Sequence, residues 1–141
     1  MYSDKNLIYI FTILEAIEKI SIYTKDFSDD EEFYESEKQL YFNAVTNLLI
    51  AIGEENKKIS DEIKEDFIFN WSEISKMRDK ISHNYRGVSP YIVWDVVINS
   101  LPPYKNLLIQ ILPQIKDYND SLEEALKSPY YTELLYLKYL K

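Results

Sequence analysis

Apolar residues recur at three- and four-residue intervals in three long stretches of this chain, which is the spacing of a helix with one buried face. The stretches cover residues 4–26, 33–58 and 71–83. Their most regular apolar positions are Leu7, Ile10, Phe11, Leu14 and Ile17 in the first, Leu40, Ala44, Leu48 and Ala51 in the second, and Trp71, Ile74, Met77 and Ile81 in the third. The pattern predicts three helices that bury these positions.

Polar residues and one glycine indicate where these helices begin and what they contact. Asn70 precedes the third helix and Glu73 lies three residues on, which is a capping-box pattern. Ser60 is expected to cap a short helical piece over residues 61–67. Gly53 lies inside the second helix, where glycine costs about 1 kcal/mol relative to alanine. A close contact with another helix would explain this glycine, and so would a simple weak point.

The second half of the chain is also expected to be helical. A serine–proline pair at 89–90 suits a capping residue followed by the first helical position. Residues 91–100 are rich in β-branched side chains and could form a strand, but turn signals for a partner strand are missing, so we predict a buried helix. A proline pair at 102–103 is expected to end that helix and to open another, which runs to about residue 116 and bends at Pro113.

The C-terminal stretch, residues 130–140, is aromatic and amphipathic. The sequence leaves open whether it is a last core helix or a docking surface for another chain. We find no internal repeat and no linker long enough to divide domains. We therefore predict an all-α protein, an up-and-down bundle of four to five main helices, in which residues 1–117 form the bundle and residues 118–141 a C-terminal helical tail of the same domain.

Composition excludes several classes of protein. The 141 residues include no cysteine, which removes disulfides, thiolate metal sites and a cysteine nucleophile. A single histidine argues against a zinc site within one chain, and we predict no metal and no cofactor. The first residues lack the basic segment of a signal peptide, and no run reaches eighteen apolar residues. We therefore expect a cytoplasmic protein that makes no use of a membrane.

Charge is unevenly distributed along the chain. The net charge of −8 argues against a protein that coats nucleic acid without specificity. Residues 29–37 hold six anions and no cation, which we interpret as a solvated connection between helices. Residues 76–86 hold four cations and one anion, Asp79. A polyanion would therefore be attracted to this one segment, where Lys76, Lys80 and Arg86 are candidate phosphate contacts.

The same eleven residues concentrate the rarest reactive side chains. They contain the only histidine, His83, and both arginines, Arg78 and Arg86, whereas the other fourteen cations are lysines. Arginine offers a rigid charged fork suited to phosphate, and histidine titrates near neutral pH. These residues predict the working site. On spacing alone, a half-exposed histidine on a basic helix is an equally good interpretation. Glu54 and Glu55 could face this site, but we expect them to face solvent.

The reaction that these side chains suggest is metal-free cleavage of RNA. A base takes the proton of the 2′-hydroxyl, an acid protonates the leaving 5′-oxygen, and a cation stabilises the crowded phosphate. One histidine cannot act at both ends at the same moment. Arg78 and His83 are also about 140° apart around an undistorted helix. A symmetric dimer would bring two histidines and two arginines to a shared cleft, so the hypothesis requires a homodimer.

The segment Arg78-Asp-Lys-Ile-Ser-His83-Asn-Tyr85 resembles the Arg-x4-His-x-Tyr signature of HepT-like toxins, small all-α proteins of the HEPN superfamily. The resemblance covers about residues 5–115. It includes an Ala-Ile-Gly-Glu element that ends at Glu54, an aromatic residue at Trp71, and the later runs Tyr85-Arg-Gly-Val, Ile92-Val-Trp94 and Leu101-Pro102, all in the family's order and spacing.

The resemblance implies a homodimeric, metal-independent endoribonuclease that is the toxin of a toxin–antitoxin pair. Arg78 and His83 would be catalytic, and Asp79 would support them. The family's usual partner is a small nucleotidyltransferase antitoxin of the MntA type, which is thought to attach AMP to the motif tyrosine, here Tyr85. Added phosphate and nucleoside two residues from the histidine would occupy the RNA site and neutralise its cations.

Two departures from the family pattern bear on this expectation. The residue after the motif arginine is often asparagine, and here Asp79 places a negative charge beside the proposed phosphate site. Glu55 and Asn56 replace small residues that often follow the Gly-Glu pair, so packing around the second helix could differ. The alternative function is a non-catalytic helical module that binds a nucleotidyltransferase or a nucleotide.

Overall fold

The computed structural model describes residues 1–83 and 87–140. Its helical elements are α1 (Lys5–Thr24), α2 (Asp30–Glu35), η1 (Ser36–Gln39), α3 (Leu40–Lys58), α4 (Asp61–Asp66), α5 (Trp71–His83), α6 (Pro90–Asp95), η3 (Val96–Ser100), α7 (Leu101–Ile111), η4 (Leu112–Gln114), α8 (Tyr118–Leu126) and η5 (Leu135–Tyr139). Over these ranges the structure contains helices and no β-strand, which confirms the all-α prediction. None of the described helices combines the length and apolar character needed to span a membrane.

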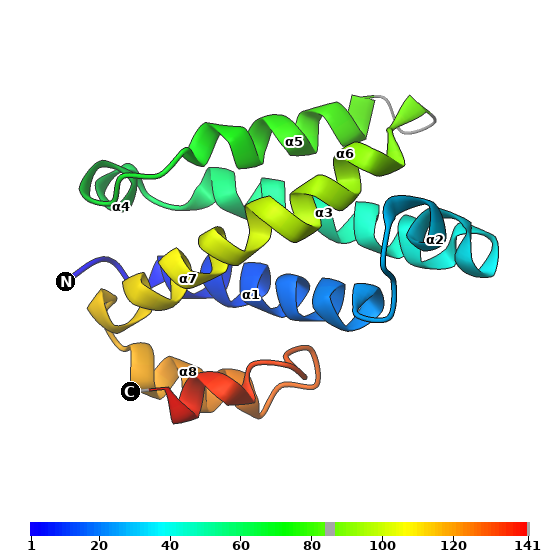
Figure 1. The fold of residues 1–141 in the computed structure, drawn as a ribbon. Coiled ribbons are helices and arrows are strands. Elements are labelled where there is room, and N and C mark those ends of the chain that lie inside the picture. The colour runs from blue at the N-terminus through cyan, green and yellow to red at the C-terminus, as the bar shows by residue number, and fades with distance from the viewer. Residues whose placement is uncertain (84–86, 141) are drawn as a thin grey trace.

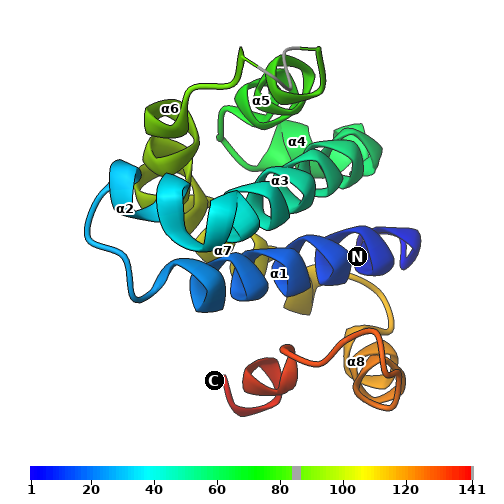
Figure 2. The ribbon, with the colours of Figure 1, turned by 90° about the vertical axis from the view of Figure 1, so that its right-hand side faces the viewer.

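The three longest helices form the centre of the molecule. α3 lies between α1 and α5 and packs against both, while the α6–η3–α7 run crosses the other helices diagonally (Figure 1). The view turned by 90° shows α5, α3, α1 and α8 one below another (Figure 2). The buried stripes of α1 and α5 agree with the predicted ones: Ile10, Leu14, Ile74 and Ile81 are all less than 5% exposed. In α3 the fully buried apolar positions are Val45, Leu49 and Ile52, each one residue on from the most regular positions of the sequence pattern, and Leu40 is 58% exposed. The helices at 4–26 and 71–83 are confirmed.

The predicted helix at 33–58 is two helices. The backbone of Glu37, Lys38 and Gln39 has positive φ values of 48°, 55° and 70°, which interrupts the right-handed helix between α2 and α3. None of these residues is glycine or proline, so no turn signal is present in the sequence at this point. Phe33 of α2 is fully buried and its ring lies 5.8 Å from that of Phe42, so core packing holds the break in place.

The prediction that the proline pair at 102–103 ends a helix is wrong. The helical run continues from α6 through a π-helical turn, η3, into α7. Proline has no N–H, so Pro102 and Pro103 cannot donate to the carbonyls four residues before them. The helix adjusts by one register step, in which the N–H of Leu101 donates to the carbonyl of Val96, five residues back. Pro113 lies within η4, where α7 ends.

The C-terminal tail packs against the outer face of α1. Leu122, Leu134 and Leu137 are buried in the same core cluster as the residues of α1 and α3. Glu15 of α1 accepts hydrogen bonds from the Glu133 backbone N–H at 2.8 Å and from the Thr132 hydroxyl at 3.2 Å. One face of the tail is therefore core, while the side chains on its other face are exposed, among them Tyr130, Leu135, Tyr139 and Leu140.

Candidate active site

α3 and α5 come into close contact at Gly53. A Cβ atom built at this position would lie 2.0 Å from the Cβ and 2.7 Å from the Cγ of Arg78. Real carbon atoms do not approach so closely, so glycine is required for the observed helix separation. The expectation that a close helix contact explains Gly53 is confirmed. The contact also determines where the side chain of Arg78 leaves α5.

Two carboxylates contact the guanidinium group of Arg78. Its Nε lies 2.6 Å from Oε1 of Glu54 on α3, and its NH1 donates a hydrogen bond of 3.1 Å to Oδ1 of Asp79. Nε is shielded from solvent, and its N–H bond is not aligned with the Glu54 oxygen, so that contact is an ion pair rather than a directed hydrogen bond. The side chain of Arg78 is 25% exposed. The guanidinium is therefore held on one edge and open to solvent on another.

Lys57 joins this cluster from α3. Its Nζ lies 3.1 Å from Oδ1 of Asp79. Hydrogen bonds from Lys57 and then from Arg78 hold the pKa of the Asp79 carboxyl below its ordinary value. Asp79 is thus anionic at neutral pH, and the positive charge of Lys57 offsets it. The aspartate that replaces the family's usual asparagine therefore has its negative charge balanced by neighbouring cations.

A buried polar network orients α5 one turn away. The Nδ2 of Asn56 donates to the Trp71 carbonyl at 2.9 Å and to Ser75 Oγ at 2.8 Å, and its Oδ1 accepts from the Tyr104 hydroxyl at 2.8 Å. Burial raises the pKa of Tyr104, so this hydroxyl remains a donor. Asn56 is 1% exposed and joins α3, α5 and α7. Asn56, which replaces a small residue of the family pattern, therefore connects three helices through its hydrogen bonds.

The predicted site residues occupy a wide arc of α5. Arg78 and Asp79 contact α3, whereas His83 is exposed at the last residue of the helix. Five residues separate Arg78 from His83, which corresponds to about 7.5 Å along the axis and about 140° around it. Lys76 and Lys80 lie further round, at the edge of a hollow between α5 and α6.

That hollow is largely apolar, with Met77, Ile81 and Val93 in its lining. Within a single chain, the two lysines therefore do not meet the guanidinium of Arg78. Two predicted site residues, Tyr85 and Arg86, lie outside the described residues.

Sequence reasoning missed two members of the cluster, namely Glu54 and Lys57. The expectation that Glu54 faces solvent is wrong, because its carboxylate contacts Arg78. Glu55 instead pairs with Lys58 at 3.1 Å, on the same helix. The sequence did contain a signal for both residues. Glu54 and Lys57 are three residues apart, so they share a helix face, and they directly follow Gly53, the glycine that indicated a close helix contact.

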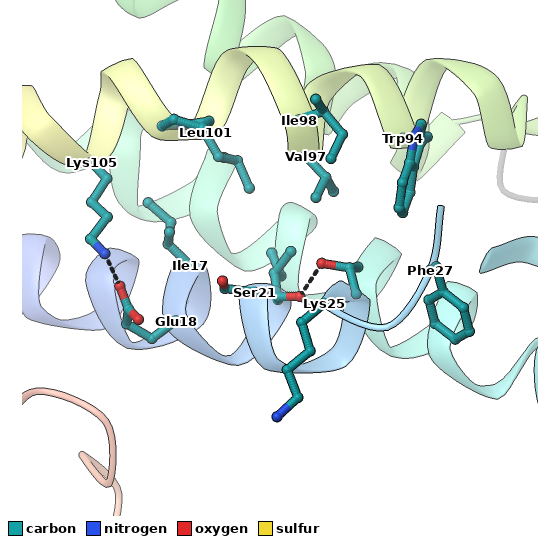
Figure 3. A pocket seen from close by; sticks show the side chains of 13 residues that line it. Ile17, Glu18, Ser21, Lys25, Phe27, Trp94, Val97, Ile98, Leu101 and Lys105 are labelled. Carbon is teal, nitrogen blue, oxygen red and sulfur yellow. Dashed lines mark hydrogen bonds and ion pairs between the residues drawn. The ribbon is translucent and has the colours of Figure 1, made fainter. Parts of the chain in front are cut away.

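Another hollow lies between α1 and the α6–η3–α7 run (Figure 3). Trp94 and Val97 project into it, and at one end Lys105 forms an ion pair with Glu18. The Thr24 hydroxyl donates to the Ile20 carbonyl at 2.8 Å. These polar groups bond with one another, and none of the predicted site residues lines the hollow. In the part of the chain that the structure describes, no group of three His, Asp or Glu side chains could hold a metal ion.

Comparisons with known proteins identify one family. The profile of the family described as ribonuclease HepT-like matches residues 13–111. A Methanocaldococcus jannaschii protein named a candidate RNase is 32% identical over 123 residues, which cover 84% of this chain and 93% of that protein. A Thermococcus cleftensis protein named a probable ribonuclease HepT is 33% identical over 98 residues, 69% of this chain and 86% of that one.

A second Methanocaldococcus jannaschii protein, named a gamma-glutamylcyclotransferase and candidate RNase, is 34% identical over 109 residues. The match covers 77% of this chain but 48% of that protein, so this chain corresponds to about half of its length. No solved structure gives a significant match.

Proposed function

The chain belongs to the ribonuclease HepT-like family, and from this premise we propose that it is a metal-independent endoribonuclease that acts as the toxin of a toxin–antitoxin pair. The observation that carries the proposal is the state of Arg78. Its guanidinium is held by Glu54 and Asp79 at a half-exposed position, on the helix that ends at His83. A fixed, always-charged donor and an exposed imidazole on the same helix suit a reaction in which negative charge develops on phosphate.

In the proposed reaction the 2′-hydroxyl of RNA attacks the adjacent phosphorus and the bond to the 5′-oxygen breaks. Arg78 donates hydrogen bonds to the phosphate oxygens and stabilises the charge of the transition state. His83 exchanges protons with the attacking or the leaving oxygen. Lys76, Lys80 and Arg86 bind neighbouring phosphates, and Asp79 supports Arg78 through its hydrogen bond to NH1.

The proposal includes a homodimer, because one histidine cannot both take and give a proton in the same step. Each chain supplies a single His83. Two copies related by a two-fold axis would supply two imidazoles and two guanidinium groups to one cleft. The exposed position of His83 at the end of α5 supports this arrangement, since a partner chain can reach it there.

The proposed partner is a minimal nucleotidyltransferase of the MntA type, which attaches AMP to Tyr85. Tyr85 lies two residues after His83 in the sequence. An added phosphate would bring negative charge and three acceptor oxygens to the cationic segment, and the nucleoside would occupy space needed by RNA. Mass spectrometry of protein co-produced with such a partner should find one or more adenylyl groups, and the Tyr85→Phe variant should carry none at this residue.

The test is cleavage of total cellular RNA in excess chelator by protein produced without a partner. We expect the wild type to cleave RNA and His83→Ala to be inactive. The Lys127→Met variant is a control, because Lys127 lies in the tail on an exposed ion pair with Glu124. Cleavage that survives in His83→Ala would mean either a contaminating nuclease or a catalytic site that does not include His83. A wild type that leaves RNA intact, yet binds a nucleotidyltransferase, would support the alternative function of a partner module.

A further inference from the structure

We propose that Glu54 is a positioning residue for RNA cleavage. Its carboxylate holds the Nε edge of Arg78, so that the opposite edge of the guanidinium faces the phosphate of the substrate. The proposal rests on the proposed function for its activity test, although its structural test is independent of activity. Glu54 acts through Arg78 and does not touch the reacting atoms.

Steric contact with α3 limits the position of the Arg78 side chain. The Cβ and Cγ of Arg78 pack against the backbone of α3 at Gly53, where a Cβ atom would come within 2.0 Å. The base of the arginine side chain is therefore confined. What remains free is rotation about the outer bonds, which decides the plane of the guanidinium. A positioning group has to act on this outer part, and Glu54 follows Gly53 directly in the chain.

Two carboxylates contact different nitrogens of the Arg78 guanidinium. Glu54 lies 2.6 Å from Nε, and Asp79 accepts a bond of 3.1 Å from NH1. Contacts at two different nitrogens define the plane of a rigid, flat group, whereas one contact leaves it free to turn. Asp79 is the residue after Arg78 on the same helix, so its bond to NH1 does not connect the guanidinium to another helix. Glu54 comes from another helix and thus connects Arg78 to the scaffold of α3.

Shielding of the Arg78 Nε from solvent makes a nearby negative charge important. Nε of Arg78 is enclosed, so water cannot solvate it, and a charged group without a partner in such a position is unfavourable. Glu54 supplies the nearby negative charge. Without that charge the guanidinium would turn its Nε edge toward water and would lose the orientation seen here. Glu54 is itself 42% exposed, so its replacement should not unfold the protein.

The charges predict an unusual kinetic signature. Arg78 and Lys57 contribute two positive charges, and Glu54 and Asp79 contribute two negative charges, so the cluster is neutral. A carboxylate near the phosphate opposes RNA binding. Removing it should therefore leave KM unchanged or lower it, while kcat falls because Arg78 is less well oriented. A residue that served only to bind RNA would raise KM, and a residue that served only to stabilise the fold would alter neither constant.

The activity test compares Glu54→Gln, Glu54→Ala and the control Glu55→Gln. Glu55 lies next to Glu54 but pairs with Lys58, so its replacement removes the same charge from the same helix without affecting Arg78. We expect Glu54→Gln to lower kcat by about 10-fold, and Glu54→Ala by up to about 100-fold, because an amide oxygen keeps a partial negative charge near Nε and a methyl group does not. Glu55→Gln should keep both constants within about twofold. Equal kcat values in all four proteins would overturn the proposal.

The structural test is the exchange of the Arg78 Nε–H proton with solvent, measured by NMR. The chain has two arginines, so two Nε–H signals are expected, and Arg78→Lys identifies the relevant one. Exchange should be slow in the wild type and in Glu55→Gln, and at least about tenfold faster in Glu54→Gln. Exchange that is unchanged in Glu54→Gln would overturn the proposal even if RNA cleavage were never observed. A wild type that fails to cleave RNA, with the exchange pattern as expected, would overturn the proposed function alone.

Discussion

Two glutamates illustrate how the same side chain serves different purposes in this protein. Glu15 on α1 is 1% exposed, and its carboxylate accepts from the Glu133 N–H and the Thr132 hydroxyl and lies 3.3 Å from Lys19. The side chain of Glu54 on α3 is 42% exposed, and its carboxylate contacts Arg78. Each of the two carboxylates contacts a segment outside its own helix.

The two carboxylates differ in how fully the fold occupies their oxygens with hydrogen-bond donors. Both oxygens of Glu15 are occupied by donors that belong to the fold, so the carboxylate fastens the tail to α1 and has no capacity left for a ligand. Glu54 contacts one edge of a guanidinium that reaches solvent on another edge. A buried, saturated charge stabilises structure, whereas a half-exposed charge pair leaves donors available for chemistry. Cleavage and the free energy of unfolding, measured in the same variants, therefore separate the two regions.

The largest expected effect is on the cleavage side. Arg78→Ala should lower the rate of RNA cleavage by about 10³-fold, since removal of one preorganised donor from a charged transition state has an effect of this order. The melting temperature should change little, because the arginine is partly exposed. Arg78→Lys keeps the charge but not the flat fork, so it should recover little of the rate. A rate within tenfold of the wild type in Arg78→Ala would contradict the assignment.

The largest expected effect on stability comes from Glu15. Glu15→Ala should lower the free energy of unfolding by about 3 kcal/mol, because the Glu133 N–H and the Thr132 hydroxyl lose their acceptor inside the protein. Cleavage per folded molecule should be unchanged. The control is Glu124→Ala, which breaks an exposed pair with Lys127 and should change stability by less than about 1 kcal/mol. Urea denaturation measures both variants, and equal losses would show that saturation of Glu15 is unimportant.

A smaller effect is expected at the buried network that joins α3, α5 and α7. Tyr104→Phe removes the donor to Asn56 Oδ1 in a fully buried position. The free energy of unfolding should fall by about 1–2 kcal/mol, since one buried acceptor is left without a partner. The volume of the side chain is nearly conserved, so no large cavity forms. Amide hydrogen exchange in α5 should be faster than in the wild type, and unchanged protection would argue that Asn56 does not anchor this helix.

The smallest expected effect is electrostatic and concerns Asp79. Lys57 and Arg78 lower the pKa of Asp79 in the folded protein. A lowered pKa means that the stabilising contribution is present above the ordinary pKa of an aspartate and is lost as the pH falls through the lowered value. Lys57→Met should move the pKa of Asp79 back up, toward its ordinary range, with little change in stability at neutral pH. NMR titration of the Asp79 carboxyl carbon measures this shift.

The matched control for that titration is Lys58→Met. It removes the same charge one residue along α3, where the ammonium pairs with Glu55. The pKa of Asp79 should stay low in this variant. An equal rise in both variants would mean that the general loss of positive charge, rather than the hydrogen bond from Lys57, controls Asp79.

Most of the fold could be predicted from local patterns. The apolar stripes of α1 and α5 and the cost of Gly53 pointed to the elements and to one close contact, because helical periodicity is a property of neighbouring residues. The break at residues 36–39 and the π-helical turn before Pro102 could not be predicted in the same way. At residues 36–39 the packing of Phe33 against Phe42 overrides the local preference for a continuous helix. At Pro102 the cause is local, but a missing N–H can be accommodated either by ending the helix or by shifting its hydrogen-bond register, and the sequence does not distinguish the two.

The sequence by itself determined the family, the helix that carries Arg78 and His83, and the concentration of cations around them, since all three are written in a short contiguous segment. The tertiary structure decided which groups meet Arg78. Glu54 and Lys57 come from another helix, and the distances of 2.6 Å and 3.1 Å depend on how closely α3 and α5 approach and how each is rotated. Those quantities are set by packing across the whole core, which helical periodicity does not encode.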